Sequence, residues 1–267
     1  MNPGDFREKN VLRFSLLGSG SSGNATLFVG EQGKVLIDNG LSFRELERRA
    51  GLVGVSLSGL DAVFITHEHS DHVLGVGVIA RKLGVPVYVT KTTHRALPAT
   101  VGNIPELRHF ESGESIQIKD LTVSSFGIPH DAVDPVSFTV QSGGAKAGIA
   151  CDLGHVPMLV RQRLNGSHAL VLESNYCPER LMAGDYPAQV RQRISSRHGH
   201  LSNQDMASLL HALLHPELRT VVLVHISENN NAPDVARRMA EQVLRGHGAS
   251  LHVASHHDPT PLFEIAV

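Results

Sequence analysis

A short stretch of histidines and acidic residues, Thr66–His72, contains the side chains with the clearest chemistry in this chain. It reads Thr-His-Glu-His-Ser-Asp-His and directly follows an apolar run, Ala62–Ile65. Because side chains alternate faces along a strand, His67 and His69 project to the same side at the strand's end and can bind one metal ion. The final aspartate and histidine of the stretch follow where the chain turns toward a helix, so they can reach a second ion. Imidazole and carboxylate ligands without a thiolate favour an open, catalytic site for zinc, iron or manganese.

Three later strand ends carry the same residue types. His130 follows the apolar segment 123–128, Asp152 follows 149–151, and His225 follows 221–224. Each is a weak signal alone, since a histidine near a strand end is commonly an ordinary polar residue and an aspartate before glycine commonly forms a turn. Together they supply the ligands that two ions need beyond Thr66–His72. Asp38 also ends a strand, and it is either a turn residue or a partner that orients a ligand histidine.

The composition limits the classes of function. With 267 residues, 41% of them hydrophobic, the chain can bury a sizeable core in one large domain or two small ones. A net charge of -2, no tryptophan and 4% aromatic residues argue against an extended nucleic-acid-binding face, so any such contact is expected to be local. The polar N-terminus, Met1–Lys9, and the lack of a long apolar run predict a cytoplasmic protein without membrane association. Cys151 and Cys177 fit that interpretation and are expected to remain unpaired.

The elements that must position these residues follow from periodicity and turn chemistry. Strands are expected at 11–17, 25–29, 35–37, 87–89, 115–124, 136–140, 146–151, 169–172 and 221–224. One helix is expected from the capping box at Ser42 to about Ala50, with Gly51 at its end, and a second over residues 73–83. A third is expected after the cap Ser202, and a fourth begins at Pro233. Two sheets packed together with helices outside, an α/β fold of the αββα sandwich type, are predicted as a single domain over residues 1–267.

The order of these residues resembles a known family. The HxHxDH signature, the earlier Asp38 and the later His130, Asp152 and His225 resemble the metallo-β-lactamase superfamily, whose fold is the αββα sandwich. Three further stretches are similar to the YycJ (WalJ) branch, described as DNA exonucleases acting from the 5′ end and related to tRNase Z and β-CASP nucleases: Gly18–Asn24, Gly199–Asn203 and His225–Asn230. The chain departs from that branch at Tyr176-Cys177, where the branch often has His-Asp, so no role is carried over to these two positions. No long insertion marks a β-CASP domain between Asp152 and His225.

The resemblance implies a ligand set and a reaction. Two divalent ions, zinc or manganese with iron as a further option, would be held by His67, His69 and His130 and by Asp71, His72 and His225, with Asp152 bridging. Two cations that share a water make it a hydroxide at neutral pH. Asp71 would orient that hydroxide, and His200 would donate a proton to the departing 3′-oxygen. The alternative interpretation of His200 is a residue that leads into the helix capped by Ser202.

Substrate contacts are expected in the glycine-serine loop and in the branch motifs. The loop could form a nest of N–H groups for a phosphate or could be only a hairpin turn. The candidates are Ser19, Ser21, Ser22, Asn24, Asn175 and Asn203. Four arginines before His200 form either a solvated helix face or further phosphate contacts: Arg180, Arg191, Arg193 and Arg197.

The leading prediction is a dinuclear metal-dependent phosphodiesterase, an exonuclease with DNA as its substrate. A lactone or thioester hydrolase is the first alternative, and it predicts activity on those compounds and none on DNA. A di-iron redox protein is the second. It predicts bound iron and usually a flavin-bearing partner domain, which this chain lacks. The sequence leaves the question of protein partners open.

Overall fold

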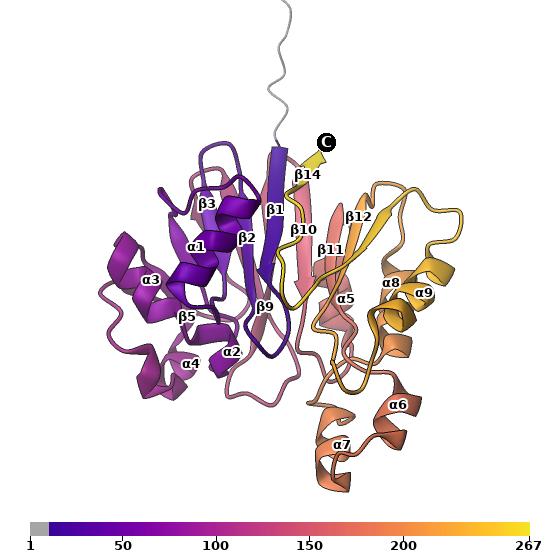
Figure 1. The fold of residues 1–267 in the computed structure, drawn as a ribbon. Helices are drawn as coiled ribbons and strands as arrows, with labels where there is room; N and C mark the ends of the chain where they lie inside the picture. The colour runs from indigo at the N-terminus through magenta and orange to yellow at the C-terminus, as the bar shows by residue number, and fades with distance from the viewer. Residues whose placement is uncertain (1–10) are drawn as a thin grey trace, which may run out of the picture.

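The computed structural model describes residues 11–267, so the prediction for Met1–Lys9 lies outside the described residues. Two seven-stranded sheets face each other (Figure 1). The first runs, in spatial order, β14 (Phe263–Ala266), β1 (Val11–Gly18), β2 (Ala25–Val29), β3 (Lys34–Ile37), β4 (Ala62–Phe64), β5 (Val87–Thr90) and β6 (Leu107–Phe110). The second runs β13 (Ser250–Val253), β12 (Thr220–Val224), β11 (Ala169–Glu173), β10 (Ala145–Ala150), β9 (Val136–Ser142), β8 (Leu121–Gly127) and β7 (Ser115–Ile118).

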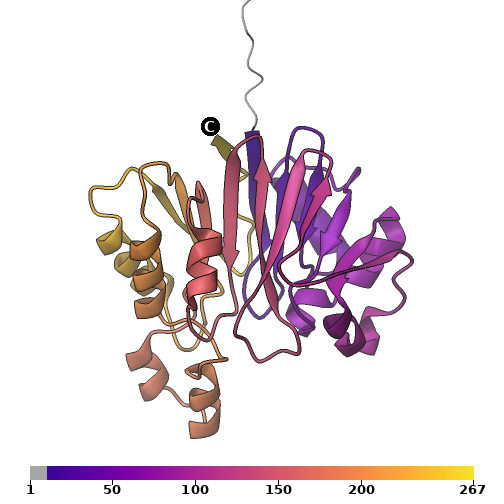
Figure 2. The same cartoon turned by 180° about the vertical axis from the view of Figure 1, so that it is seen from behind.

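The helices cover the outer faces of the sheets. The first sheet carries α1 (Phe43–Leu52), α2 (Ser70–Val73), α3 (Val76–Leu83), α4 (Lys91–Ala96) and the short 3₁₀ helix η1 (Ala99–Val101). The second carries α5 (Met158–Leu164), α8 (Asn203–Leu213) and α9 (Pro233–Val243). Two more helices, α6 (Pro178–Ala183) and α7 (Ala188–Ile194), project beyond the end of the sandwich in both views (Figures 1 and 2). The predicted αββα sandwich is confirmed.

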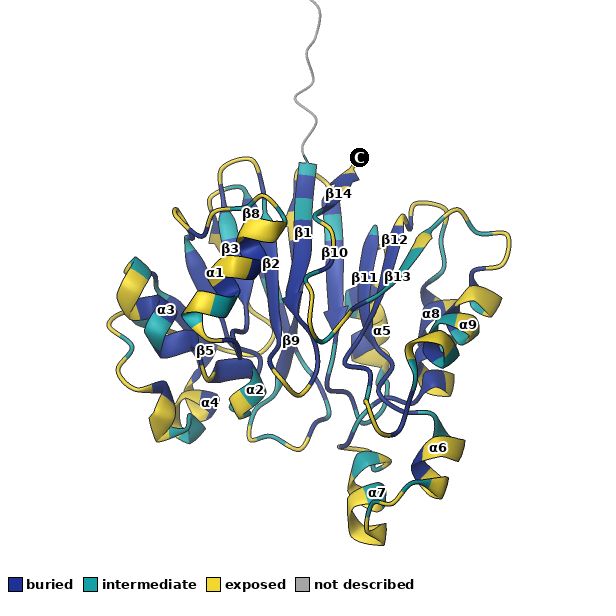
Figure 3. Ribbon diagram, in the orientation of Figure 1, coloured by how far each residue is buried: buried dark blue, intermediate teal, exposed yellow. Residues whose placement is uncertain are grey.

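Three hydrophobic layers hold the sandwich together. Phe14, Phe28 and Phe138 belong to the layer between the sheets, while Leu46 and Leu209 belong to the layers under the outer helices. In β1, Leu12, Phe14 and Leu16 face the central layer and Leu17 faces the helices, as strand alternation requires. The central strands of both sheets are accordingly buried, whereas the edge strands β6, β7, β13 and β14 are partly exposed (Figure 3). None of the helices in the described part of the chain is long and apolar enough to cross a lipid bilayer.

Each sheet joins an antiparallel meander to a parallel half. Pairing is antiparallel along β14-β1-β2-β3 and β7-β8-β9-β10, and parallel along β3-β4-β5-β6 and β10-β11-β12-β13. The carboxyl ends of parallel strands meet at one edge, which is where loops of a layered α/β protein form a site. The two parallel halves therefore present their strand ends at the same end of the sandwich.

Several element boundaries differ from the prediction. The helix expected over 73–83 begins at Val76 as α3, and the short helix α2 ends at Val73. Gly75 lies between them and packs so closely against the loop after β3 that a Cβ would lie 1.9 Å from the Leu41 carbonyl oxygen. Helix α1 continues through Gly51, and the left-handed turn falls at Gly54 (φ +74°). The strand expected over 115–124 is the hairpin β7-β8. The Ser202 and Ser42 caps are confirmed, since their side chains accept the backbone N–H groups of Asp205 and Glu45.

Candidate metal centre

The predicted ligands converge from both sheets on the end of the sandwich where the parallel strands finish. They come from the segments that follow β4, β8, β10 and β12, and Asp38 joins them from the segment that follows β3. Three of the four non-glycine residues with positive φ in residues 11–267 lie here: Asp38 (+60°), Asp152 (+56°) and His225 (+54°). Left-handed backbone is costly for such residues and persists where the surroundings hold it, often at functional sites. The sharp turn at each strand end places these side chains in the centre.

The first candidate ligand group brings together His67, His69 and His130, the three histidines predicted to share one ion. His67 Nε2 lies 3.0 Å from His69 Nδ1, which lies 3.4 Å from His130 Nε2. Two nitrogens bound to one tetrahedral zinc ion lie roughly 3.3 Å apart, so this spacing fits a metal ion. His130 Nδ1 donates to the Gly199 carbonyl oxygen at 3.1 Å, which leaves its Nε2 lone pair for a ligand bond. Burial lowers the pKa of His67 and of His130 and keeps both rings neutral, the form that binds metal.

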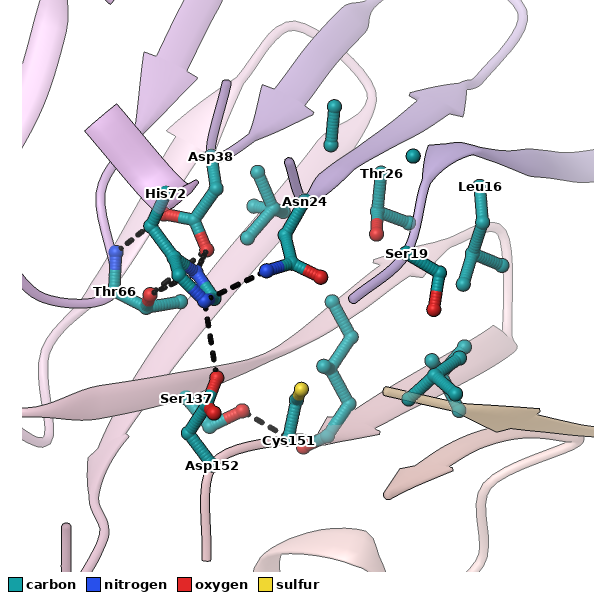
Figure 4. Close-up of a pocket in the computed structure, with 16 residues that line it drawn as sticks. Leu16, Ser19, Asn24, Thr26, Asp38, Thr66, His72, Ser137, Cys151 and Asp152 are labelled. Atoms are coloured by element: carbon teal, nitrogen blue, oxygen red, sulfur yellow. Dashed lines mark hydrogen bonds and ion pairs between the residues drawn. The ribbon is translucent and has the colours of Figure 1, made fainter. Parts of the chain in front are cut away.

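The second group surrounds His72 (Figure 4). Its Nδ1 donates to Asp38 Oδ2 at 2.8 Å, while its Nε2 lies 3.1 Å from Asp152 Oδ2 and 3.6 Å from Asp71 Oδ2. The other Asp152 oxygen, Oδ1, lies 2.9 Å from His225 Nδ1. Burial alone would lower the pKa of His72, but the carboxylates of Asp38 and Asp152 raise it well above its ordinary value. Asp38 is therefore both a turn residue and the partner that orients a ligand-type histidine.

Asp152 lies between the two groups. Its carboxylate, His67 and His72 have ligand atoms within 4.8 Å of one another, and His67 also belongs to the first group. Imidazoles with a shared carboxylate form a donor set suited to divalent ions such as zinc and manganese. The residues present therefore fit a pair of divalent ions, and Asp152 would be the residue that the two share.

His225 has two further neighbours that the sequence did not assign. Cys151 Sγ lies 3.6 Å and Glu173 Oε1 3.2 Å from its Nδ1. Burial raises the pKa of the Cys151 thiol well above its ordinary value, so it remains protonated and is a poor metal ligand. Both cysteines are free, as expected.

His200 lies beside the centre and is held by Glu173. Its Nδ1 donates to Glu173 Oε1 at 2.7 Å, and Glu173 Oε2 accepts the backbone N–H groups of Leu153 and Leu201 at 2.8 and 3.1 Å. Burial would raise the pKa of the fully buried Glu173, but His200 lowers it below its usual range, so the carboxylate is charged. Sequence reasoning missed Glu173. The available signal was a carboxylate that closes the apolar strand β11, as Asp38 and Asp152 close theirs.

A cleft of about 280 Å³ opens over the centre, and His69, Asp71, His130, Asp152, His200 and His225 line it. Of the four arginines, Arg193 alone lines this cleft, with its Nε 2.8 Å from Asp131 Oδ2. The others contact neighbouring parts of the chain: Arg180 donates to Asn231 O, Arg191 to Gly184 O and Tyr186 O, and Arg197 lies 3.1 Å from His155.

The six residues expected to touch substrate fall into different environments. Ser21 is exposed and lines the cleft, and Ser22 is exposed beside it. Asn24 is buried, and its Nδ2 lies 2.9 Å from His72 Nε2 and donates to Asp71 Oδ2 at 3.1 Å. Ser19 is also buried, and its hydroxyl accepts the His225 N–H at 3.0 Å. The serine-glycine loop thus holds the metal-centre residues as well as facing the cleft.

The two expected asparagines also have internal partners. Asn175 donates to the His225 carbonyl oxygen at 2.9 Å. Asn203 departs from the expectation, because its side chain is fully buried and bonded to Ser174 and Asn231, out of reach of a substrate. Asn203 is the first residue of α8, and its side chain joins this helix to the segments after β11 and β12.

Comparison with known proteins agrees with the geometry. Residues 34–226 match the family model described as the beta-lactamase superfamily domain. The chain is 36% identical over 254 residues to the exodeoxyribonuclease YycJ of Bacillus anthracis, which covers 94% of this chain and 96% of that protein. It is 33% identical over 263 residues to the exodeoxyribonuclease WalJ of Streptococcus pneumoniae, with 95% and 98% covered. The crystal structure of the metallo-β-lactamase fold protein YhfI from Bacillus subtilis superposes with a TM-score of 0.69 at 15% identity, over 93% of this chain and 99% of that one.

The ligand order, the sandwich and the similarity over nearly the whole length lead to the same assignment. This chain belongs to the metallo-β-lactamase superfamily, on the branch that contains YycJ and WalJ.

Proposed function

We propose that this protein is a metal-dependent exodeoxyribonuclease of the cytoplasm that removes nucleotides from the 5′ end of DNA. One observation carries the proposal furthest: His200 is fixed by Glu173 at 2.7 Å and lines the same cleft as the metal-ligand residues. A phosphodiester needs such a proton donor, because the alkoxide that leaves is strongly basic. The names of YycJ and WalJ support DNA as the substrate.

The proposed ligands are those of the two groups above. His67, His69 and His130 would hold one ion, and Asp71, His72 and His225 the other, with Asp152 shared. Zinc or manganese bound there supplies an acidified water and neutralises charge on the phosphate. Asp38, Thr66 and Gly199 hold the rings in place through hydrogen bonds to His72, His67 and His130.

The remaining chemistry belongs to two side chains. Asp71, at the cleft wall, orients the attacking water and accepts its proton. The water oxygen bonds to phosphorus, the bond from phosphorus to O3′ breaks, and His200 Nε2 gives its proton to O3′. Glu173 accepts the Nδ1–H of His200 and so fixes the orientation of the ring. The products are a released nucleotide with a 3′-hydroxyl and a strand that begins with a 5′-phosphate.

An assay with alternative substrates tests this function. Wild-type protein loaded with zinc or manganese is given 3′-labelled single-stranded and double-stranded DNA, the same sequence as RNA, a lactone and a thioester. We expect stepwise shortening of DNA from its 5′ end that a chelator abolishes. Inactivity on every nucleic acid, with opening of the lactone or thioester, would replace the nuclease by a small-molecule hydrolase. Bound iron with redox activity would point to the di-iron alternative.

A further inference from the structure

A second pocket adjoins the metal cleft on the far side of His200. It has a volume of about 180 Å³ and shares Ser21, Ile194, His200 and His225 with the cleft. Its own walls come from Tyr186, between α6 and α7, and from the loop Ser227–Asn230 after β12. The pocket therefore opens directly beside the proton donor, away from His69 and His130.

Tyr186 stands apart from the other aromatic residues. Most phenylalanines and tyrosines of the described chain are buried, including Phe14, Phe64 and Tyr88. Tyr186 is half-buried, and it is the one phenylalanine or tyrosine, within residues 11–267, that lines this pocket or the metal cleft. Its hydroxyl accepts a hydrogen bond from Asn229 Nδ2 at 2.7 Å, which ties the ring to the opposite wall. A held aromatic ring of this kind is a stacking platform for a nucleobase.

The polar groups of the pocket suit a nucleoside and not a phosphate. No lysine or arginine lines it. Apart from His200 and His225, which it shares with the metal cleft, its polar side chains are amides, hydroxyls and the carboxylate of Glu228. The metal cleft, in contrast, has the guanidinium of Arg193 at its wall. Amides and hydroxyls recognise base edges and sugar hydroxyls, whereas phosphates need cations or N–H nests.

We propose that the pocket between Tyr186 and Ser227–Asn230 binds the nucleoside at the end of the DNA strand. The inference rests on the proposed function, because the oxygen that receives the proton of His200 is O3′ of that terminal nucleoside. The scissile phosphate lies at the metal centre, and the departing nucleoside lies on the His200 side, where the neutral pocket is. A pocket of about 180 Å³ has room for a single base.

The test uses two 3′-labelled single strands that differ only at the 5′ end, one with a thymidine and one with an abasic tetrahydrofuran residue. The measured quantity is kcat/KM for the first cleavage. Wild-type protein is expected to cleave the abasic end roughly 5- to 150-fold more slowly, the range that a lost base stack produces. Tyr186→Ala is expected to cleave the intact end at that reduced rate and to lose the discrimination. Tyr186→Phe keeps the aromatic ring and is expected to retain most of the discrimination between the two ends.

Met182→Ala is the matched control, since Met182 is an exposed side chain of the same projecting pair of helices and lines neither pocket. Equal rates of wild-type protein on both ends, or full discrimination by Tyr186→Ala, would overturn the pocket while leaving the nuclease intact. If wild-type protein cleaves neither strand, the proposed nuclease function fails. In that case, thymidine binding measured by saturation-transfer NMR tests the pocket independently of nuclease activity. A weaker signal for Tyr186→Ala than for Met182→Ala supports the pocket, and equal signals refute it.

Discussion

The metal centre and the helix pair α6–α7 lie side by side but are built on opposite principles. At the centre, Asp38, Asp152 and His225 are buried, hydrogen-bonded and held in left-handed backbone. In the helix pair, α7 buries none of its residues and α6 buries only Leu181 (Figure 3). Many buried contacts fix atoms closely, whereas few allow local opening at low cost. Under the proposed function, the phosphodiester bond is cleaved at the well-packed end of the sandwich, and the terminal nucleoside is bound beside the loosely packed helix pair.

The largest effect is expected at the centre. His67→Ala removes a ring of the first ligand group whose ligand atom also lies within 4.8 Å of those of His72 and Asp152, so the variant should bind less metal and lose activity to the background level. Elemental analysis of the purified protein and the exonuclease assay measure the two effects. Circular dichroism controls for folding. A variant that retains its metal and its activity would show that the centre is not the site of chemistry.

His200→Ala should lower kcat roughly 10²- to 10⁴-fold, the usual range for a lost general acid, with the metal content unchanged. A thymidine phosphodiester with a p-nitrophenolate leaving group tests the reason, because that group departs without a proton. The variant should therefore lose far less activity on it than on DNA. Equal losses on both substrates would make His200 a structural residue of the rim.

Asp38→Asn should weaken metal binding about 10- to 100-fold, as loss of an orienting carboxylate typically does. The carboxylate holds His72 Nδ1 at 2.8 Å, and an amide there is a weaker acceptor. Competition with a chromogenic chelator measures the affinity. Asparagine also tolerates positive φ, so the backbone turn is preserved and the charge is tested separately. Unchanged affinity would mean that Asp38 acts only in the turn.

Arg193→Ala probes the projecting helices, where effects should be smaller. Replacing a phosphate contact should raise KM severalfold and reduce the slope of log affinity against log salt concentration by about 1, with little change in kcat. Arg238→Ala is the matched control, because Arg238 forms an exposed pair with Asp234 at 3.7 Å on α9 and lines neither pocket. Equal behaviour of the two variants would remove Arg193 from the substrate path.

The smallest effect is expected at Asp120, in the β7-β8 turn. Partial burial would raise its pKa, but backbone N–H groups of residues 31–33 and the Ser142 hydroxyl lower it below the ordinary 3.8. A carboxyl group whose pKa is lower in the folded than in the unfolded state stabilises the fold at pH values above its unfolded pKa. This stabilisation is lost as the pH falls through the folded pKa. Asp120→Asn should therefore reduce the free energy of unfolding by about 1 kcal/mol at pH 7, and the difference should shrink below pH 3.8, with no change in activity.

Urea unfolding at several pH values measures this difference. Asp120 and Glu173 both accept backbone N–H groups, but only Glu173 lies at the metal centre. A loss of stability in Asp120→Asn with unchanged activity would show that such a carboxylate affects catalysis only at the centre. A constant difference across the pH range would instead assign the effect to packing.

Sequence and structure determined different parts of this protein. The ligand types, their order and their positions at strand ends were readable from the sequence, because they depend on local patterns such as apolar runs closed by His67, Asp152 or His225. The caps at Ser42 and Ser202 were readable for the same reason. Helices α6 and α7 were not, since neither buries enough apolar surface to leave a periodic pattern.

Only the packing of the two sheets decided which residues meet. Glu173 contacts His200 across 27 positions of sequence, and His69 lies beside His130 across 61. Packing also buried Asn203, left Arg193 at the cleft and placed Tyr186 opposite Asn229. The physical reason is that a side chain's exposure and neighbours are set by long-range contacts between layers, which no spacing within one segment contains.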